Sequence, residues 1–498
     1  MDGSKRTPCL ENTRRNTIND IMQWISDDSS EAKKVLWVYG LAGTGKSTLS
    51  TTIAQIMLSI HRLGAFFFFN RDIPQRNSGT LIRTLAYQLA VFDARFGAAI
   101  SRLVTDKGNI AMMPLEFQFE NLLFNTLKSV EWSGGPIVLI IDALDECGRE
   151  ADRRDLMRAL SKGFSDLPSF IRIMVVSRQE SDIQHALGSH LHLCPYPLDI
   201  DSATNKDDIL GYIRRRLEEI RKNNERLGDH WPGEDKISSL ANRAGGLFIW
   251  ASTACLYIES YAPNRRLSEL VDKQPGGSSG PFAHLDSLYE TGLQSTDLWH
   301  DALFRSDCSN ILGAILSARV PLSCSVIDAL LEPQDMSSWE SVSRLGCVLH
   351  VSETEPIRIL HPSFHDYLSE RCEDKPWSIN LERHNKDLAL RCIKLLDKEL
   401  RENICDMTLP YLSQKKTIPE AISYACKFWI EHICLIPTVD DDNDDLFSTI
   451  YNFLDKHLLH WMEAMTILKC HDLTIRSIDN LMKWLRVCST ICMMGALH

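Results

Sequence analysis

The chain has 498 residues, which is too many for one hydrophobic core, so we expect roughly three or four domains. Hydrophobic residues make up 44% and charged residues 24% of the sequence, as in an ordinary globular protein. The formal net charge of -12 argues against a general nucleic-acid-binding protein, because such proteins need basic surface to displace counterions. The 15 cysteines include no C-x-x-C pair, which fits reduced thiols better than a disulfide framework.

The N-terminal segment is polar and lacks the apolar stretch of a secretion signal. Within residues 1–30, apolar side chains recur at helical spacing from Thr17 to Ile25, so we expect a lead-in helix followed by a linker. A strongly apolar stretch further on, from Leu247 to Ile258, is too short to cross a bilayer. The sequence therefore predicts a cytoplasmic protein without a membrane span.

Between residues 31 and 200, short apolar runs alternate with segments of helical periodicity. The runs are rich in β-branched and aromatic residues, which is typical of strands covered on both faces. This alternation predicts an α/β fold in which right-handed crossovers build a parallel five-stranded sheet with helices on both faces. The predicted strands are VLWVYG (35–40), GAFFFFN (64–70), PIVLIID (136–142), IRIMVVS (171–177) and LHLCPYPL (191–198).

The strand pattern largely stops after this region, and the rest of the chain reads as helical. We expect a charged helix over 206–222 and two further helices separated by Gly245-Gly246. A Pro/Gly/Ser-rich segment at 275–281 predicts a linker. Two short apolar runs at 346–351 and 356–361 would form a hairpin, and helical patterns resume beyond them.

The segment from Gly40 to Ser47 matches the phosphate-binding pattern G-x-x-x-x-G-K-[ST], and it lies between an apolar strand and a helical segment. Glycines let the backbone wrap around phosphates, while backbone N–H groups and the helix N-terminus supply partial positive charge. Lys46 would pair with the β- and γ-phosphates, and Ser47 would ligate Mg²⁺. The alternative is a glycine-rich turn with an incidental lysine. The predicted cradle comprises Gly40, Gly43, Thr44, Gly45, Lys46 and Ser47.

The run PIVLIIDALDEC places carboxylates after the third predicted strand. Asp142 would reach the carboxyl edge of the sheet beside the cradle and hold the magnesium ion through water. Asp145 or Glu146 would orient water on the γ-phosphate as the general base. The alternative is an acidic surface cluster after a core strand. Ala143 stands where many fast ATPases have glutamate, which favours slow turnover and a switch.

Arg178 follows the fourth predicted strand, IRIMVVS, and so lies at the same edge of the sheet. An arginine at this position could sense the charge of a γ-phosphate. The alternative is a solvated or ion-paired arginine without a role in binding.

Together these motifs resemble the NACHT family of signal-transduction NTPases (STAND P-loop NTPases), and within it the fungal NOD-like receptors. The resemblance also extends to the nephrocystin-3-like N-terminal NTPase region. The segments that carry it are CLENTRRNTINDIMQW, GLAGTGKST, SGTLIRTLAYQLA, DALDEC, VVSRQE, GLFIWAST, LHPSFHDYL and YACKFWIEH. Members usually add an N-terminal effector and C-terminal repeats, and we expect neither in this sequence.

The resemblance implies a domain order, an ADP-bound closed state, and opening and homo-oligomerisation when ATP binds. The implied domains are a lead-in helix and linker (1–30), the NACHT nucleotide-binding domain (31–200), a small helical domain (201–270), a linker (271–284), a winged-helix domain (285–375) and a helical bridge (376–498).

The resemblance also implies roles for single residues. Thr13 and Arg14 match the lead-in that packs near adenine. His361 matches a winged-helix histidine directed toward the β-phosphate of ADP, with His365 as the second candidate; the alternative is a hydrogen-bonded core histidine. The residues expected to bind phosphate and Mg²⁺ are Gly43, Gly45, Lys46, Ser47, Thr48 and Asp142.

Three functions remain open from the sequence. The first is a switch, plausible in fungal innate immunity or regulated cell death, in which ATP/ADP exchange with Mg²⁺ controls assembly with partner proteins that the sequence does not identify. The second is a conventional P-loop ATPase or kinase. The third is a scaffold or decoy that binds nucleotide without switching.

Overall fold

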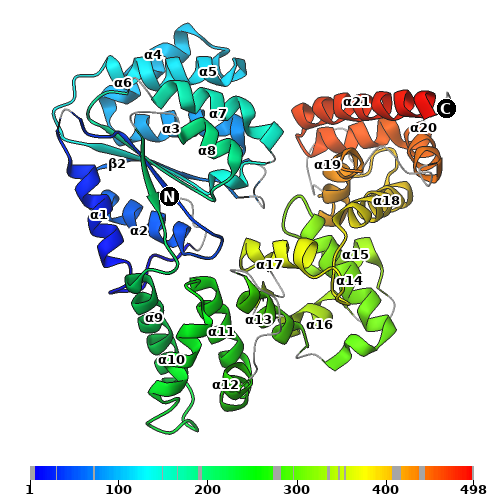
Figure 1. The fold of residues 1–498 in the computed structure, drawn as a ribbon. Helices are drawn as coiled ribbons and strands as arrows, with labels where there is room; N and C mark the ends of the chain where they lie inside the picture. The colour runs from blue at the N-terminus through cyan, green and yellow to red at the C-terminus, as the bar shows by residue number, and fades with distance from the viewer. Residues whose placement is uncertain are drawn as a thin grey trace. The chain divides into compact units, whose positions relative to one another are not determined.

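The computed structural model describes residues 6–29, 31–70, 73, 75–148, 150–164, 167–188, 193–272, 282–294, 297–333, 337–345, 348–352, 355–405, 417–436 and 444–495 (Figure 1). The chain divides into two compact units, Met1–Leu288 and Tyr289–His498, which we describe separately. The centre of the predicted linker, 273–281, lies outside the described residues. The domain boundaries given above therefore remain predictions.

The first unit contains the parallel sheet that the apolar runs predicted. Its order is β2-β3-β4-β1-β5, and every neighbouring pair is parallel. All five predicted strands are confirmed. Their bounds are Val35–Tyr39 (β1), Leu63–Phe68 (β2), Ile137–Asp142 (β3), Ile171–Ser177 (β4) and Leu193–Pro197 (β5).

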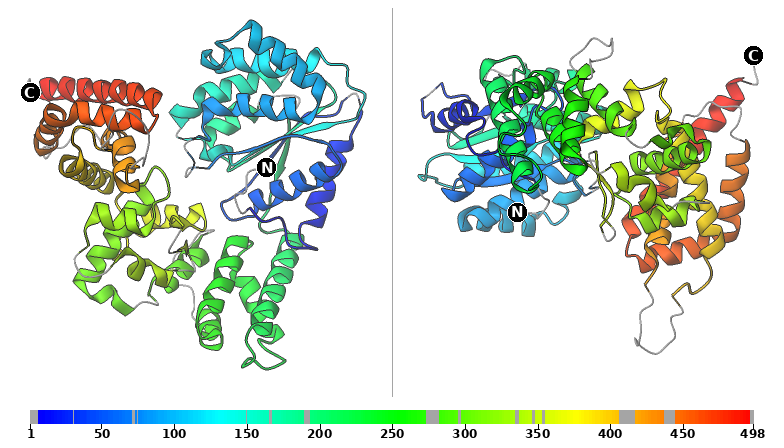
Figure 2. Two further views of the ribbon diagram at one scale, coloured as in Figure 1. Left: turned by 180° about the vertical axis from the view of Figure 1, so that it is seen from behind. Right: turned by 90° about the horizontal axis from the view of Figure 1, so that it is seen from below.

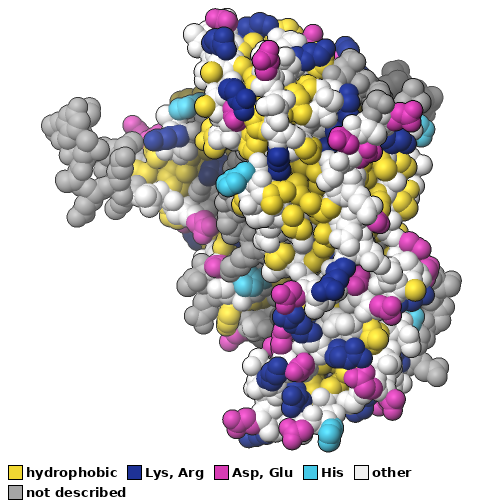
Figure 3. Space-filling model, turned by 90° about the vertical axis from the view of Figure 1, so that its left-hand side faces the viewer, with side chains coloured by type: hydrophobic (Ala, Val, Ile, Leu, Met, Phe, Trp, Pro, Cys, Tyr) yellow, Lys and Arg dark blue, Asp and Glu magenta, His cyan; other side chains and the backbone are white. Residues whose placement is uncertain are grey.

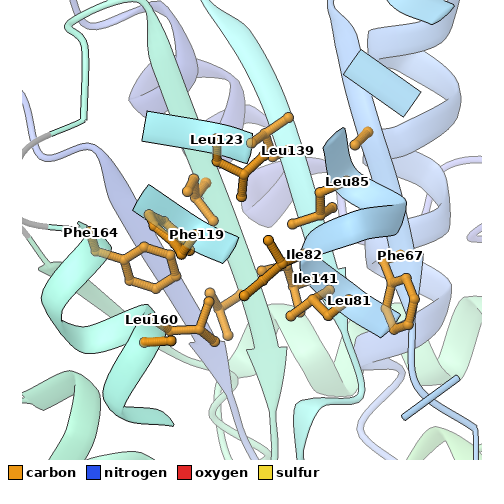
Figure 4. Close-up of a cluster of buried hydrophobic side chains, with 14 of the residues drawn as sticks. Phe67, Leu81, Ile82, Leu85, Phe119, Leu123, Leu139, Ile141, Leu160 and Phe164 are labelled. Atoms are coloured by element: carbon orange, nitrogen blue, oxygen red, sulfur yellow. The ribbon is translucent and has the colours of Figure 1, made fainter. Parts of the chain in front are cut away.

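The strands are apolar throughout because each face of the sheet has its own core. Along β3, Ile137, Leu139 and Ile141 face one core while Val138 and Ile140 face the other, as the two-residue period of a strand requires. Figure 4 shows the first core, in which Leu139 and Ile141 meet side chains of α3 and of the segments around Phe119 and Leu160. Packing on both faces holds the central strands in place and so positions the residues at their carboxyl ends.

Helices cover both faces of the sheet, as predicted (Figures 1 and 2). Helices α1 and α2 pack on one face, with Ile21, Ile25 and Leu49 in the second core. The other face is covered by α3 to α8. The bounds are Arg15–Ser26 (α1), Lys46–Ser59 (α2), Ser78–Phe92 (α3), Ala94–Asp106 (α4), Leu115–Gln118 (α5), Thr126–Lys128 (α6), Glu150–Phe164 (α7) and Ser181–Gly188 (α8).

Over residues 198–272 the sheet is followed by the helices Ala203–Lys222 (α9), Glu234–Arg243 (α10), Phe248–Ser260 (α11) and Pro263–Asp272 (α12). The predicted break at Gly245-Gly246 separates α10 from α11. Gly246 has φ +79°, and a Cβ there would lie 2.2 Å from the carbonyl oxygen of Ile200. Only glycine fits this close approach, which places the start of α11 beside the segment that follows β5.

In its described residues, the second unit is mainly helical and contains a small antiparallel hairpin. Leu349–His350 (β6) pairs with Arg358–Ile359 (β7), within the two runs predicted to form a hairpin. The helices are Ala283–Gln294 (α13, which crosses the unit boundary), Ala302–Ser317 (α14), Cys324–Leu331 (α15), Ser338–Val342 (α16), Pro362–Asp366 (α17), Leu381–Glu399 (α18), Glu420–Cys434 (α19), Asp444–Ile467 (α20) and His471–Gly495 (α21).

Figure 3 shows the side of the molecule that lies at the left of Figure 1. Hydrophobic side chains gather in its middle, and side chains of opposite charge alternate in its lower part, where α9 and α10 lie. Between these two helices, Arg214 of α9 and Glu234 of α10 form an ion pair at 2.7 Å. Among the helices described, none is both long enough and apolar enough to cross a membrane.

Candidate functional site

The predicted cradle connects β1 to α2, which begins at Lys46. Gly43 and Gly45 have φ values of +83° and +84°, a conformation that glycine adopts at little cost. The ammonium group of Lys46 donates to the carbonyl oxygens of Gly40 at 2.9 Å and of Leu41 at 2.8 Å. Burial lowers the pKa of Lys46 to about 8. The loop thus has the backbone geometry and the lysine that phosphate binding requires.

The start of α11 contacts this loop directly. The backbone N–H of Ile249 donates to the carbonyl oxygen of Gly43 at 3.0 Å. A Cβ on Gly43 would lie 2.0 Å from the Cγ2 atom of Ile249, and one on Gly45 would lie 3.8 Å from the ring of Phe248. Glycine at position 43 is therefore needed twice, for its own backbone angle and for the approach of α11.

Arg14 connects the lead-in segment to the same loop. Its Nη2 donates to the carbonyl oxygen of Thr44 at 2.6 Å, and its guanidinium lies 4.9 Å from the centre of the Phe248 ring. The carboxylate of Asp208 accepts the backbone N–H of Arg14 at 3.1 Å. Arg14 is buried, its pKa is lowered by that burial, and its Nε has no hydrogen-bond partner among the described residues. The neighbouring Thr13 hydroxyl donates to the Leu10 carbonyl oxygen at 2.7 Å.

Asp142 ends β3 beside the first turn of α2 and is fully buried. Its Oδ1 accepts the backbone N–H of Ala143 at 2.9 Å and lies 3.4 Å from the hydroxyl of Ser47. Its Oδ2 forms an ion pair with Arg6, whose guanidinium also lies 3.9 Å from the centre of the Phe68 ring. The structure thus brings the two predicted Mg²⁺ ligands together and adds an arginine that the sequence did not predict.

Asp145 and Arg178, which follow the adjacent strands β3 and β4, form an ion pair in which Asp145 is buried. Asp145 Oδ1 accepts the backbone N–H of Arg178 at 3.0 Å, and its Oδ2 lies 3.2 Å from Arg178 Nε. The Asp145 side chain is 4% exposed, whereas that of Arg178 is 25% exposed. Glu146, the next residue, is half-buried. Both oxygens of Asp145 are therefore engaged in holding Arg178.

Arg153, in the first turn of α7, lies behind this pair. It bonds to the carbonyl oxygen of Asp145, to that of Gly148, and to the carboxylates of Glu180 and Asp182. The two acidic groups raise the pKa of the Arg153 guanidinium above its ordinary value, and its bonds lower the pKa of Asp182. No sequence pattern singled out Arg153, because its partners come from two separate segments, 145–148 and 180–182.

The predicted histidines lie in the second unit. The Nδ1 atom of His361 accepts the backbone N–H of Ser363 at 3.1 Å and so caps the start of α17. His365 lies within α17 and is half-buried. A role of either histidine toward a nucleotide stays a prediction.

The donor set of the loop fits a nucleotide with Mg²⁺. Glycines at two left-handed positions, a lysine and a helix N-terminus suit phosphates, and a serine hydroxyl beside a buried carboxylate suits a hard cation. Among the described residues, no group of three or more His, Cys, Asp or Glu side chains could hold a metal ion.

Three other residues at this site were missed in addition to Arg153. Arg6 and Asp208 belong to segments without a motif, and only the folded chain brings them to the loop. Ile249 lies in the segment GLFIWAST, which carries part of the family resemblance but does not by itself indicate a contact with the loop. The available signal in the sequence was the position of Ile249, which follows the pair Gly245-Gly246 at the start of a helix.

The fold and the site define a class. A parallel sheet with the order β2-β3-β4-β1-β5, a glycine-rich loop after β1 and an aspartate ending β3 form a P-loop NTPase-like fold, which is followed by helical domains. Residues 14–178 match the family model described as Nephrocystin 3, N-terminal. This match covers the loop, Asp142 and Arg178, and it supports a nucleotide-binding NTPase. No curated protein matches the chain.

Solved structures that align with this chain include a STAND protein with a tetratricopeptide repeat sensor from Pyrococcus horikoshii, at 12% identity and a TM-score of 0.41 over 97% of this chain. The chain spans 59% of that protein's length. C. elegans PCH-2 aligns over 56% of this chain and 70% of its own, at 14% identity and a TM-score of 0.32. Drosophila ORC bound to AT-rich DNA and Cdc6 aligns over 95% and 69%, at 12% identity and a TM-score of 0.25.

Proposed function

We propose that this chain is a nucleotide-dependent switch of the NACHT type, which binds ATP or ADP with Mg²⁺ at residues 40–48. The supporting observation is the contact between Gly43 and Ile249, which joins the phosphate loop to the first turn of α11. A change in the loop on exchange of ADP for ATP would act directly on this helix. Such differential contacts are what a ligand needs to shift a conformational equilibrium.

The loop residues have distinct roles in this proposal. The backbone N–H groups of Gly43, Thr44 and Gly45 would bind phosphate oxygens, and Lys46 would exchange its bonds to loop carbonyls for the β- and γ-phosphates. Ser47 and Asp142 would hold Mg²⁺, which would offset phosphate charge. Thr48, half-buried in the first turn of α2, would bind a phosphate through its hydroxyl.

The acidic turn, Leu144–Glu146, follows β3 and carries two carboxylates to which we assign different roles. Asp145 would position Arg178, since both its oxygens already face that residue. Glu146 would orient water near the γ-phosphate, and Arg178 would sense the phosphate charge. The displaced base favours slow hydrolysis, as suits a switch.

The lead-in segment would lie beside the base. Arg14 is held by Thr44, Asp208 and Phe248, and its buried Nε is a donor for which the described residues supply no acceptor. A ring nitrogen of adenine or a ribose oxygen would satisfy such a donor. By the resemblance, Thr13 would lie near adenine, and His361 would be the candidate residue for the β-phosphate of ADP.

The wider role follows from the resemblance. We propose a cytoplasmic protein that forms a homo-oligomer in its ATP state and acts with other proteins in fungal innate immunity or regulated cell death, with residues 285–375 as a winged-helix domain.

The experiment that tests the proposed switch is to measure the mass and shape of the purified chain in ADP and in a non-hydrolysable ATP analogue. A switch predicts a larger or more extended species in the analogue, which Lys46→Ala removes. Unchanged mass and shape with bound nucleotide would show a scaffold, and brisk steady-state hydrolysis would show a conventional ATPase.

A further inference from the structure

The acidic turn and the Arg178 segment are joined at two places. At the first, the carboxylate of Asp145 holds Arg178 through its backbone N–H and its Nε. At the second, Arg153 bonds on one side to the carbonyl oxygens of Asp145 and Gly148, and on the other to the carboxylates of Glu180 and Asp182. The two connections close a ring that contains both groups proposed to act on the γ-phosphate.

Arg153 uses all of its hydrogen-bonding capacity in this ring. A guanidinium has five N–H donors in a fixed plane, and each of them has a partner here. Nε and Nη2 form a paired contact with the two oxygens of Asp182 at 2.6 and 2.8 Å, and Nη1 reaches the two backbone carbonyls at 3.2 and 3.0 Å. A lysine has three donors around a single point and could not span both sides.

The position of Arg153 also separates it from the reacting groups. It is 3% exposed and lies at the base of the acidic turn, bonded to the backbone of Asp145 and to side chains that follow Arg178 in the chain. None of its donors is left over for a ligand. Its influence on a nucleotide must therefore act through the placement of other residues.

We propose that Arg153 is a positioning residue, which sets the distance between the acidic turn and Arg178 and thereby lets the site distinguish ATP from ADP. This inference rests on the proposed function. Loosening the ring would leave the phosphate loop intact, so binding of ADP would persist. It would misplace Glu146 and Arg178, so hydrolysis and the preference for a γ-phosphate would be lost.

The test uses Arg153→Lys and Asp182→Asn in the full chain. Arg158→Lys serves as the matched control, because Arg158 lies on the same helix with its side chain 61% exposed. For each folded variant, as judged by thermal unfolding, the Kd of ADP, the Kd of a non-hydrolysable ATP analogue and kcat for ATP are measured. Asp182→Asn keeps the test decisive if Arg153→Lys fails to fold, since the Asp182 side chain is 14% exposed.

We expect both ring variants to bind ADP within about twofold of the unmodified chain, while kcat and the ratio of analogue to ADP affinity fall about tenfold, as for loss of one well-placed charged hydrogen bond. The control should change neither. Folded ring variants with unchanged kcat and ratio would overturn the inference, as would a loss of ADP affinity by the same factor as that of the analogue. An unmodified chain that binds no nucleotide would overturn the proposed function and the inference together.

Discussion

Arg6 forms an ion pair with Asp142, the buried aspartate at the end of β3, while its guanidinium packs on the ring of Phe68. Asp142 is also the residue that we assign to Mg²⁺, and its other oxygen faces the hydroxyl of Ser47. A guanidinium and a magnesium ion are both cations that seek the same carboxylate. The N-terminal segment would therefore compete with Mg²⁺ for this carboxylate.

Removal of this arginine should make Mg²⁺ easier to bind. The Arg6 side chain is 22% exposed, so the pair is only partly screened and should contribute about 1 kcal/mol, or about a fivefold effect. We expect Arg6→Ala to lower by that factor the Mg²⁺ concentration that half-saturates nucleotide binding, measured by titration with a fluorescent ADP. Arg15→Ala, which removes an exposed arginine bonded to Asn12, is the control. A shift of equal size in both variants would exclude competition at Asp142.

Gly43→Ala should damage both the loop and the packing of α11. Its φ of +83° disfavours a side chain, and the added Cβ would clash with Ile249. We expect a loss of about 2–4 kcal/mol in the free energy of unfolding, together with loss of nucleotide binding. Gly211→Ala is the matched change, because a Cβ at Gly211 in α9 would meet nothing within 4 Å. It should be neutral or stabilise by up to about 1 kcal/mol. Chemical unfolding measures both, and equal effects would refute the close approach.

Glu146→Gln and Asp145→Asn should separate the two carboxylates of the acidic turn. If Glu146 orients water, its amide variant should bind ATP normally and hydrolyse it about a hundredfold more slowly. Asp145→Asn should weaken its ion pair with Arg178 and so reduce the preference for ATP over ADP. Single-turnover hydrolysis and equilibrium binding measure the two effects. The assignment fails if the Glu146 variant hydrolyses ATP at the unmodified rate.

His432 should make the stability of the second unit depend on pH. It is buried between Tyr424 at 2.8 Å and Asn385 at 2.9 Å, and burial lowers the pKa of His432 from 6.5 to about 3. Between pH 6.5 and about pH 3, the unfolded chain therefore binds a proton at this histidine, whereas the folded chain does not. Stability is full above pH 6.5 and falls as the pH drops from 6.5 toward 3, by up to about 1.4 kcal/mol for each pH unit.

This decline can be followed by urea unfolding with tryptophan fluorescence, since Trp429 and Trp461 pack against each other in the same helical region. His432→Gln, which cannot take up a proton, should be less stable at neutral pH but should show a shallower slope between pH 6.5 and pH 4, within the window set by the two pKa values. Parallel slopes in the two proteins would show that another group is responsible.

The sheet could be predicted from the sequence because burial on both faces leaves long apolar runs. Once β1 and β3 were placed, Lys46, Ser47 and Asp142 had to meet, since the carboxyl ends of parallel strands share one edge. The Ile249 contact could not be predicted in the same way. It joins segments about two hundred residues apart, and no pattern in either segment indicates that the two are in contact.

The ion pairs within the site also could not be predicted from the sequence. Arg6 is one of many arginines in the chain, and only the path of the N-terminal segment brings it to Asp142. Arg153 differs from Arg154 beside it only in the side of α7 that it occupies, which depends on where that helix begins. The resemblance of the motifs predicted which residues are important at strand ends and did not predict what holds them in place.

Nucleotide binding by the purified chain tests the central claim most directly. Calorimetric titration with ADP and Mg²⁺ should show saturable binding of a single nucleotide. Lys46→Ala should weaken it about ten- to a hundredfold, since a charged hydrogen bond to phosphate contributes about 1.5–3 kcal/mol. Absence of saturable binding by the unmodified chain, or equal affinity in the folded Lys46→Ala variant, would contradict the account.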